Sequence, residues 1–375
     1  MESELKADIL NTIEQQTDTV ETFVPVTVAT PSPVVVKNIA YYNKKITPAL
    51  LPKYFERNPA RLAYALMFFT LNAILIFLVL NLELHWALKI LAGFVIGQFN
   101  AGMTFVSHET LHGSVVKNKT LQDLICLFTF TPFLISPTYW RFWHNRLHHG
   151  NTQYILKDPD AFPTLMVYRQ SKFMQRLFNW TPGANTLRSY FYFFFWFSFQ
   201  SFINQVYMRF GNKMWSEMKH TRVSIEFGLQ LLMLGSLIYF IGLNNFAFLV
   251  LIPFAIQNYT VMSYISTNHN ISPLTKVNDP LVNSLTVTTN RVFDFFHLSF
   301  GYHVEHHIFP RMSGAYTKKV HAELIKQFPD TYQFMKKSKA LKLLYSTARI
   351  YKNHTTLINP NTLKTYKTLP HPTQR

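Results

Sequence analysis

Residues 227–268 decide the fold: they read FGLQLLMLGSLIYFIGLNNFAFLVLIPFAIQNYTVMSYISTN and contain no Asp, Glu, Lys or Arg. A helix needs about 20 mostly apolar residues to cross the hydrocarbon core of a bilayer. The stretch is long enough for two such helices, and residues 242–245 (Gly-Leu-Asn-Asn) have the composition of a turn. It therefore predicts a pair of membrane-spanning helices joined by a tight connection.

Two more runs upstream of this pair lack charged side chains over a membrane-spanning length. They cover residues 62–82 and 90–107, which brings the predicted number of spans to about four. Residues 124–140 and 189–208 are also apolar, but the first is short and interrupted by prolines, and the second is unusually aromatic. Because aromatic rings favour the headgroup level of a bilayer, we expect both runs in the interface, with a fifth or sixth span as the alternative.

The composition agrees with a membrane protein. Of 375 residues, 48 % are hydrophobic and only 15 % are charged, against about 25 % charged in an average soluble domain. So apolar a chain is not disordered as a whole, and Cys126, the single cysteine, cannot form a disulfide within the chain. Lys and Arg outnumber Asp and Glu by 36 to 19. We assign this excess to anionic lipid headgroups and expect no nucleic-acid partner.

The positions of the basic residues predict the orientation in the membrane. The short connections between the first and second spans and between the third and fourth spans contain Lys89 and no other Lys or Arg. Nearly all other basic residues lie in the N-terminal segment, in residues 117–222 and from residue 276 onward. The positive-inside rule then places both termini and the central stretch in the cytoplasm.

These features together predict an all-α fold. We expect a polytopic integral membrane helical bundle, with about four transmembrane helices, interfacial helices and a cytoplasmic His-rich cap. Residues 1–45 are expected to form a largely disordered cytoplasmic tail, residues 46–345 the membrane domain and residues 346–375 a C-terminal cytoplasmic tail. The N-terminal residues resemble neither a secretory signal nor an Arg-rich transit peptide, which favours a bacterial inner membrane.

Three short clusters contain eight of the 15 histidines. They read H-E-T-L-H at residues 108–112, H-N-R-L-H-H at residues 144–149 and H-V-E-H-H at residues 303–307. All three fall on the face of the bilayer that the basic residues mark as cytoplasmic. Imidazole is a common metal ligand, so this agreement indicates a metal site at the cytoplasmic membrane surface.

The spacing within the clusters favours two metal ions. On a helix, residues i and i+4 share a face, so His108 and His112 can converge on one ion. Adjacent residues such as His148 and His149 point about 100° apart and are better placed to serve two neighbouring ions. So many histidines exceed what zinc needs, which favours two iron ions. Two histidines outside the clusters, at the end of the fourth span and just before the third cluster, could complete the coordination. The candidate ligands are therefore His108, His112, His144, His148, His149, His269, His297, His303, His306 and His307.

A competing interpretation starts from the first cluster alone. His108-Glu109-Thr110-Leu111-His112 fits H-E-x-x-H, in which two histidines bind zinc and the glutamate is the general base of a metalloprotease. An intramembrane zinc protease also needs a third ligand, for which Asp279 is the nearest acidic candidate. This interpretation leaves the other two clusters unexplained. A non-catalytic metal-binding membrane protein is a further alternative.

From about residue 46 onward the chain resembles the membrane fatty acid desaturases. The three clusters match that family's histidine boxes in order, and residues 140–152 resemble the W-x-x-x-H-x-x-x-H-H-x-N-T stretch of acyl-lipid desaturases of the Δ12/ω3 type. Two departures are Gly113, where plant-like members often have a further His, and His303, where front-end desaturases usually have Gln. The sequence also has no H-P-G-G haem-binding signature, which argues against a fused cytochrome b5 domain.

The resemblance implies a reaction and its partners. Two ferrous ions held by the boxes would use O2 and two electrons to remove two hydrogens from the acyl chain of a membrane lipid. The electrons would come from a separate donor, ferredoxin or cytochrome b5. A hydroxylase, epoxygenase or ketolase with the same boxes remains the alternative, because the outcome depends on how the second C–H bond is positioned. The polar side chains expected to orient the imidazoles are Glu109, Asn145, Asp158 and Glu305.

Overall fold

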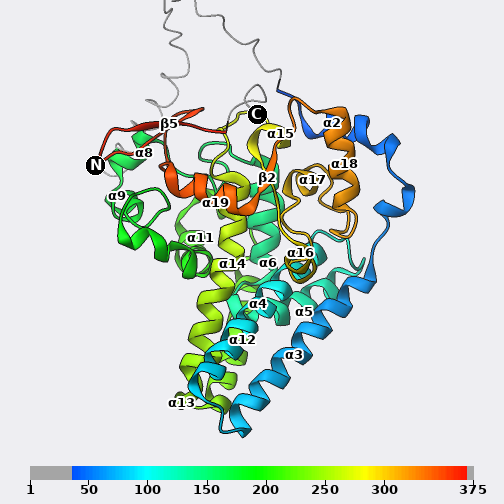
Figure 1. Cartoon of the computed structure of the whole chain (residues 1–375), viewed down its shortest axis with the longest axis vertical. Coiled ribbons are helices and arrows are strands. Elements are labelled where there is room, and N and C mark those ends of the chain that lie inside the picture. The colour runs from blue at the N-terminus through cyan, green and yellow to red at the C-terminus, as the bar shows by residue number, and fades with distance from the viewer. Residues whose placement is uncertain (1–35, 370–375) are drawn as a thin grey trace, which may run out of the picture. The chain divides into compact units, whose positions relative to one another are not determined.

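The computed structural model describes residues 36–369, which belong to one compact unit that begins at Val36 (Figure 1). Most of the predicted N-terminal tail, residues 1–45, therefore lies outside the described residues. The exception is its last part, where helix α2 (Ile39–Ile46) begins, with Asn38 capping the amide of Tyr41.

Four helices of the described part are long and apolar enough to cross a membrane. They are α3 (Leu62–Asn81), α4 (Trp86–Leu111), α12 (His220–Ile241) and α14 (Ile252–His269). Helix α14 continues directly from the short α13 (Leu243–Phe246) and the π-turn η9 (Ala247–Leu251). Gly242 forms the predicted turn after α12, with a positive φ of 71° that suits glycine. The prediction of an α-helical membrane bundle with four spans is confirmed.

The long helices differ in how far they are buried. Helix α4 is the most buried and packs against both α3 and α14, whereas few side chains of α3 and α12 are buried. Their exposed residues are large and apolar, as expected for surfaces that face lipid. Examples are Leu66, Phe69 and Phe77 on α3 and Leu232, Tyr239 and Phe240 on α12.

Small residues let α4 approach its neighbour closely. A Cβ atom on Gly93 would lie 2.3 Å from the carbonyl oxygen of Phe248, and one on Gly97 would lie 2.7 Å from Cβ of Ile256. These two glycines are four residues apart and form a G-x-x-x-G motif, which is typical of close helix packing in membranes.

The remaining elements form what we call the cap, the part of the described chain outside the four long helices and the connections between α3 and α4 and between α12 and α14. Figure 1 shows the long helices extending from the cap, with α13 at their far end. The helices of the cap besides α2 are α5 (Lys119–Thr129), α6 (Pro137–Trp140), the π-helix η5 (Arg141–His148), α7 (His149–Asn151), α8 (Leu165–Gln170), α9 (Lys172–Phe178), α10 (Trp196–Ile203), the π-helix η7 (Asn204–Met208), α11 (Arg209–Gly211), α15 (Pro280–Asn283), α16 (Arg291–Phe296), α17 (His303–Ile308), α18 (Thr317–Gln327) and α19 (Lys337–Ser346). The 3-10 turns are η1 (Thr47–Ala49), η2 (Pro52–Phe55), η3 (Pro59–Arg61), η4 (Thr131–Phe133), η6 (Leu187–Phe194) and η8 (Lys213–Trp215).

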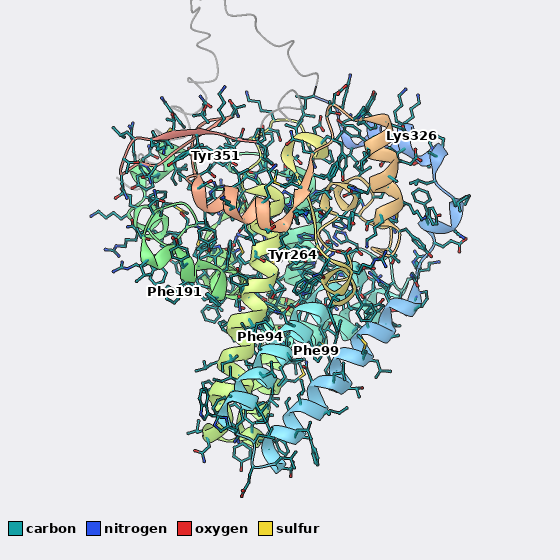
Figure 2. All side chains as sticks on the ribbon, viewed as in Figure 1. Phe94, Phe99, Phe191, Tyr264, Lys326 and Tyr351 are labelled. Carbon is teal, nitrogen blue, oxygen red and sulfur yellow. The ribbon has the colours of Figure 1, made fainter. Side chains whose placement is uncertain are left out.

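The two apolar runs expected in the interface form short helices of the cap. Neither contributes one of the four candidate spans found in the described residues. The aromatic run is divided among η6, α10 and η7, and it exposes several rings, among them Tyr190 and Phe191 (Figure 2). Exposed aromatic rings beside the long helices agree with a position at the headgroup level.

Short strands, like the π-helices, were not predicted from the sequence. Strand β1 (Thr286–Thr288) pairs in parallel with β2 (Phe334–Lys336), and β3 (Ile350–Asn353), β4 (Thr356–Ile358) and β5 (Thr365–Lys367) form an antiparallel sheet. The second sheet is anchored by the buried Tyr351, whose hydroxyl donates to the carbonyl of Ser272 at 2.7 Å. The predicted domain boundaries at residues 45 and 345 are not tested by these contacts and stay a prediction.

Candidate metal centre

Nine of the candidate histidines converge in two groups at the junction of the long helices and the cap. In each group one ring nitrogen per residue lies within 4.8 Å of the others. What we call group one contains His108, His112, His144, His149 and His306, and group two contains His148, His269, His303 and His307.

The approach of the ring nitrogens fits shared metal ions. Within group one, Nε2 of His144 lies 3.0 Å from Nε2 of His108 and 3.2 Å from Nε2 of His149. Within group two, Nε2 of His303 lies 2.8 Å from Nε2 of His269 and 3.1 Å from Nε2 of His307. Nitrogens bound side by side to one ion, with bonds of about 2.1 Å, are separated by about this distance. The buried Nε2 of His112 has no hydrogen-bond partner among the described residues, as expected of a ligand atom.

Local helix geometry decides which histidine joins which group. His108 and His112 lie one α-turn apart on α4 and its end, so both reach group one. The second box lies on the π-helix η5, whose wider turn aligns residues i and i+5. His144 therefore shares group one with His149, while His148 turns toward group two. On α17, His303 and His307 reach group two and His306 reaches group one.

The electrostatics keep most of these imidazoles neutral at pH 7. Burial lowers the pKa of His144, His149 and His303, and positive charge on neighbouring histidines lowers it further. At His148 burial also lowers the pKa, but the carboxylates of Asp158 and Asp160 raise it more, so the net shift is upward. A neutral imidazole has the free lone pair that a metal ion requires.

Sequence comparison gives the family. Residues 84–339, more than half of the chain, match the profile of the fatty acid desaturase family. The chain belongs to the fatty acid desaturase family. The four long apolar helices agree with this family and make the chain a membrane protein.

Two curated plant relatives agree with this assignment. A stretch of 93 residues is 30 % identical to the chloroplastic omega-6 fatty acid desaturases of Brassica napus and Arabidopsis thaliana. It covers 23 % of this chain and 21 % and 20 % of the two relatives. The chain thus matches only about a fifth of the length of each plant enzyme.

Asp158 is the predicted carboxylate that contacts a histidine of the two groups. Its Oδ1 lies 3.0 Å from Nδ1 of His148, which leaves Nε2 of that ring for a metal ion. Its Oδ2 accepts from the amide of Gln153 at 2.7 Å, so the carboxylate is itself held in place. Carboxylates in this position fix the orientation of a ligating imidazole.

Several orienting groups were not predicted from the sequence. Asp160 Oδ2 lies 3.4 Å from Nδ1 of His148, the carbonyl of Asn283 lies 3.2 Å from Nδ1 of His269, and Thr152 Oγ1 lies 3.3 Å from Nδ1 of His307. Asp160 could have been suspected, because it stands two residues after Asp158. The carbonyl of Asn283 and the hydroxyl of Thr152 could not be predicted, because every residue has a backbone carbonyl and threonine is common throughout the chain.

The other three predicted orienting residues contact no member of the two groups through the hydrogen bonds of the described residues. Glu109 forms a buried ion pair with Arg61 at 2.6 Å. Asn145 donates to the carbonyl of Leu111 at 2.9 Å. Glu305 accepts from Thr286 at 2.6 Å and lies 2.9 Å from Nδ1 of His321. These contacts fix the elements that carry the boxes: Glu109 joins α4 to η3, Asn145 joins η5 to α4, and Glu305 joins α17 to β1.

His297 is the one candidate ligand that lies outside both groups. Its Nδ1 lies 2.9 Å from the hydroxyl of Tyr264 and its Nε2 lies 3.1 Å from Oε1 of Gln98. Both ring nitrogens therefore have protein partners. The tenth predicted ligand is thus placed in a hydrogen-bonded contact between α14 and α4, apart from the two groups.

The geometry of the site gives no support to the zinc-protease interpretation. Its general base would be Glu109, which is held by Arg61. The proposed acidic ligand, Asp279, accepts from the hydroxyl of Tyr42 at 2.9 Å and belongs to none of the metal-binding groups found in the described residues.

Proposed function

We propose that this protein is an acyl-lipid desaturase that uses O2 and two electrons to introduce a double bond into the acyl chain of a membrane lipid. The observation that carries the proposal is the pair of histidine groups, in a chain of the desaturase family. Group one and group two would each hold one iron ion. Iron bound there supplies the oxidising power that ordinary side chains lack for an unactivated C–H bond.

The overall reaction balances with two external electrons. One R–CH2–CH2–R′ unit, one O2, two electrons and two protons give one R–CH=CH–R′ unit and two waters. We propose that the electrons come from a separate ferredoxin or cytochrome b5.

A cavity beside the histidines fits the acyl chain. What we call the aromatic cavity has a volume of about 690 Å³, and Phe162, Trp196 and Phe197 are among its mostly apolar lining residues. It shares Trp143, Asp160 and Ile265 with a small space of about 20 Å³ that His108, His148 and His303 line. An acyl chain in the aromatic cavity would therefore extend toward both histidine groups.

The mouth of this cavity suits a substrate that arrives from the bilayer. Phe173 and Tyr207 line it and expose 53 % and 73 % of their surface, as aromatic residues at a membrane interface do. The chain's own residues then hold the methylenes in place and exclude water, which is how a protein positions two adjacent C–H bonds for successive removal.

The orientation of the protein belongs to the proposal. The bias of basic residues supports cytoplasmic termini and a cytoplasmic cap. A bacterial inner membrane stays a prediction.

Fatty acid analysis of a host that expresses the chain tests the proposal. The host should also express a ferredoxin with its reductase, so that electron supply does not limit the reaction. We expect new unsaturated fatty acids with the native chain and with His354→Ala, an exposed histidine outside both groups. We expect none with His148→Ala, which removes a proposed ligand.

The products also discriminate among the alternatives. Hydroxylated fatty acids in place of unsaturated ones would replace the desaturase proposal by the hydroxylase alternative. Unsaturated products that persist in His148→Ala would contradict the assignment of the two groups as the reaction centre.

A further inference from the structure

A second large cavity lies on another side of α14 and is not used by the proposed reaction. What we call the Lys337 cavity has a volume of about 810 Å³ and lies among α4, α14, α16 and the start of α19. One wall is apolar, with Phe94, Ile256 and Tyr259, and another carries hydroxyl and amide groups, with Ser263 and Asn290. Lysines line it, but no acidic residue does.

Lys337 has no anionic partner among the described residues. No carboxylate of the described residues forms an ion pair with its Nζ, which lies 3.1 Å from the centre of the Tyr264 ring. Burial lowers the pKa of Lys337 well below its ordinary value. The side chain is half-buried, and an anion in the cavity would favour the charged form of its amine, because a nearby opposite charge offsets the cost of burial.

Two neighbouring features add positive potential to the same place. Helix α19 begins at Lys337, and no side chain caps its first turn. A helix N-terminus presents amide groups and a partial positive charge that favour phosphate. Lys336, the residue before the helix, also lines the cavity and adds a second cation.

Aromatic side chains separate the Lys337 cavity from the histidine groups. Tyr264, which lines the cavity, packs on Phe105 and Phe300 with ring centres 5.8 Å apart in both contacts. Phe300 in turn contacts His108 and His303. A molecule in this cavity is therefore not the acyl chain that reaches the centre from the aromatic cavity.

The location fits a component of the bilayer. Figure 2 shows Tyr264 where the long helices meet the cap, and Phe94 farther along the long helices. The cationic end of the cavity thus lies toward the cap and the apolar wall extends along α4. This arrangement matches a lipid whose polar headgroup lies near the cap and whose acyl chains lie along α4.

We propose that the Lys337 cavity binds a membrane phospholipid, with its phosphate on Lys337 and the start of α19 and an acyl chain along Phe94 and Ile256. The site is distinct from the proposed substrate path and does not depend on the proposed reaction.

Native mass spectrometry of the purified full-length protein tests the site. The probes are dioleoylphosphatidylglycerol and, without phosphate, dioleoyl monogalactosyldiacylglycerol. We expect phosphatidylglycerol to bind more tightly. Lys337→Gln should weaken phosphatidylglycerol binding by about tenfold, because the substitution removes one charge-assisted hydrogen bond to the phosphate. Lys337→Arg should retain binding. Lys342→Gln, an exposed lysine of α19 that does not line the cavity, should have no effect.

Three results would overturn the proposal. The first is equal binding of the galactolipid and phosphatidylglycerol. The second is an equal loss of phosphatidylglycerol binding in Lys337→Gln and Lys342→Gln, when both variants have the thermal stability of the native protein. The third is displacement of phosphatidylglycerol by excess inorganic phosphate, which would identify free phosphate as the ligand. Phosphatidylglycerol that stays bound in excess phosphate supports the lipid.

Discussion

At the scale of residues, neighbours in sequence serve different groups. His148 and His149 are adjacent, yet the first belongs to group two and the second to group one, and His306 and His307 divide in the same way. The sequence predicts this division from the 100° step between adjacent helical residues. It could not separate His269, at the end of the fourth span, from His297, six residues before the third box, because both lie on the side of the membrane where the boxes are. Only the tertiary contacts place His269 in group two and His297 between Tyr264 and Gln98.

Asp158 gives the sharpest prediction at this scale. Asp158→Asn removes the charge that orients His148, and loss of such a partner lowers metal affinity by about 10- to 100-fold. Iron retained during titration with a chelator measures the change. Asp330→Asn, an exposed carboxylate, should retain iron like the native protein, and an unchanged iron content in Asp158→Asn would refute the orienting role.

The metal-free protein should become less stable as the pH falls. Burial lowers the pKa of His144, His149, His303, His306 and His307 in the folded chain. Below about pH 6.5 the unfolded chain therefore takes up protons that the folded chain does not, and the free energy of unfolding decreases. The pKa of His148 is raised, so this one residue has the opposite effect on the free energy of unfolding, but it is outnumbered by the others.

Thermal unfolding of chelator-treated protein between pH 8 and pH 5 checks this prediction. The midpoint temperature should be highest at the alkaline end and fall most steeply below about pH 6.5. A midpoint that rises as the pH falls would show that the histidines are not buried in neutral form.

At the scale of elements, the long helices were predictable and the π-helix was not. Residues 62–82, 90–107 and 227–268 lack charge over membrane-spanning lengths, and a bilayer imposes helices on such runs. Helix η5 has no comparable signal, because a π-helix depends on tertiary contacts rather than on composition. The sequence therefore identified the second box but not the i, i+5 alignment that brings His144 to His149.

The glycines of α4 give a prediction about helix packing. Gly93→Ala places a Cβ atom 2.3 Å from the carbonyl oxygen of Phe248, so α4 and η9 must move apart, at a cost of about 1–3 kcal/mol in the free energy of unfolding. Gly235→Ala on α12 meets no atom within 4 Å and should leave stability unchanged or raise it by about 0.5–1 kcal/mol. Denaturation in detergent compares the two, and equal effects would contradict the close approach.

At the scale of the whole molecule, the sequence predicted where the histidines gather but not how the cap is built. The charge bias and the four spans bring the three boxes to one face, and the structure places them together. The two cavities could not be predicted, because each is lined by segments that are far apart in sequence. Nor could the sheet of β3, β4 and β5 be predicted, in which Tyr351 packs with Leu274 of the rest of the cap.

Chemical labelling tests the orientation of the molecule. Cys126 is fully buried, and burial raises the pKa of its thiol, so the native chain should react little with maleimide. Asn244→Cys, in the turn after α12, should react with an impermeant maleimide on intact cells. Lys339→Cys, on the exposed face of α19, should react only after the membrane is opened. The reverse pattern would contradict cytoplasmic termini.

Metal analysis of the purified protein tests the central claim most directly. Protein produced with ample iron should contain about two iron atoms per chain and little zinc, since two groups of histidines are available. His148→Ala should lose most of the iron of group two, and His354→Ala should lose none. One zinc atom per chain with no iron would contradict the account of a di-iron desaturase.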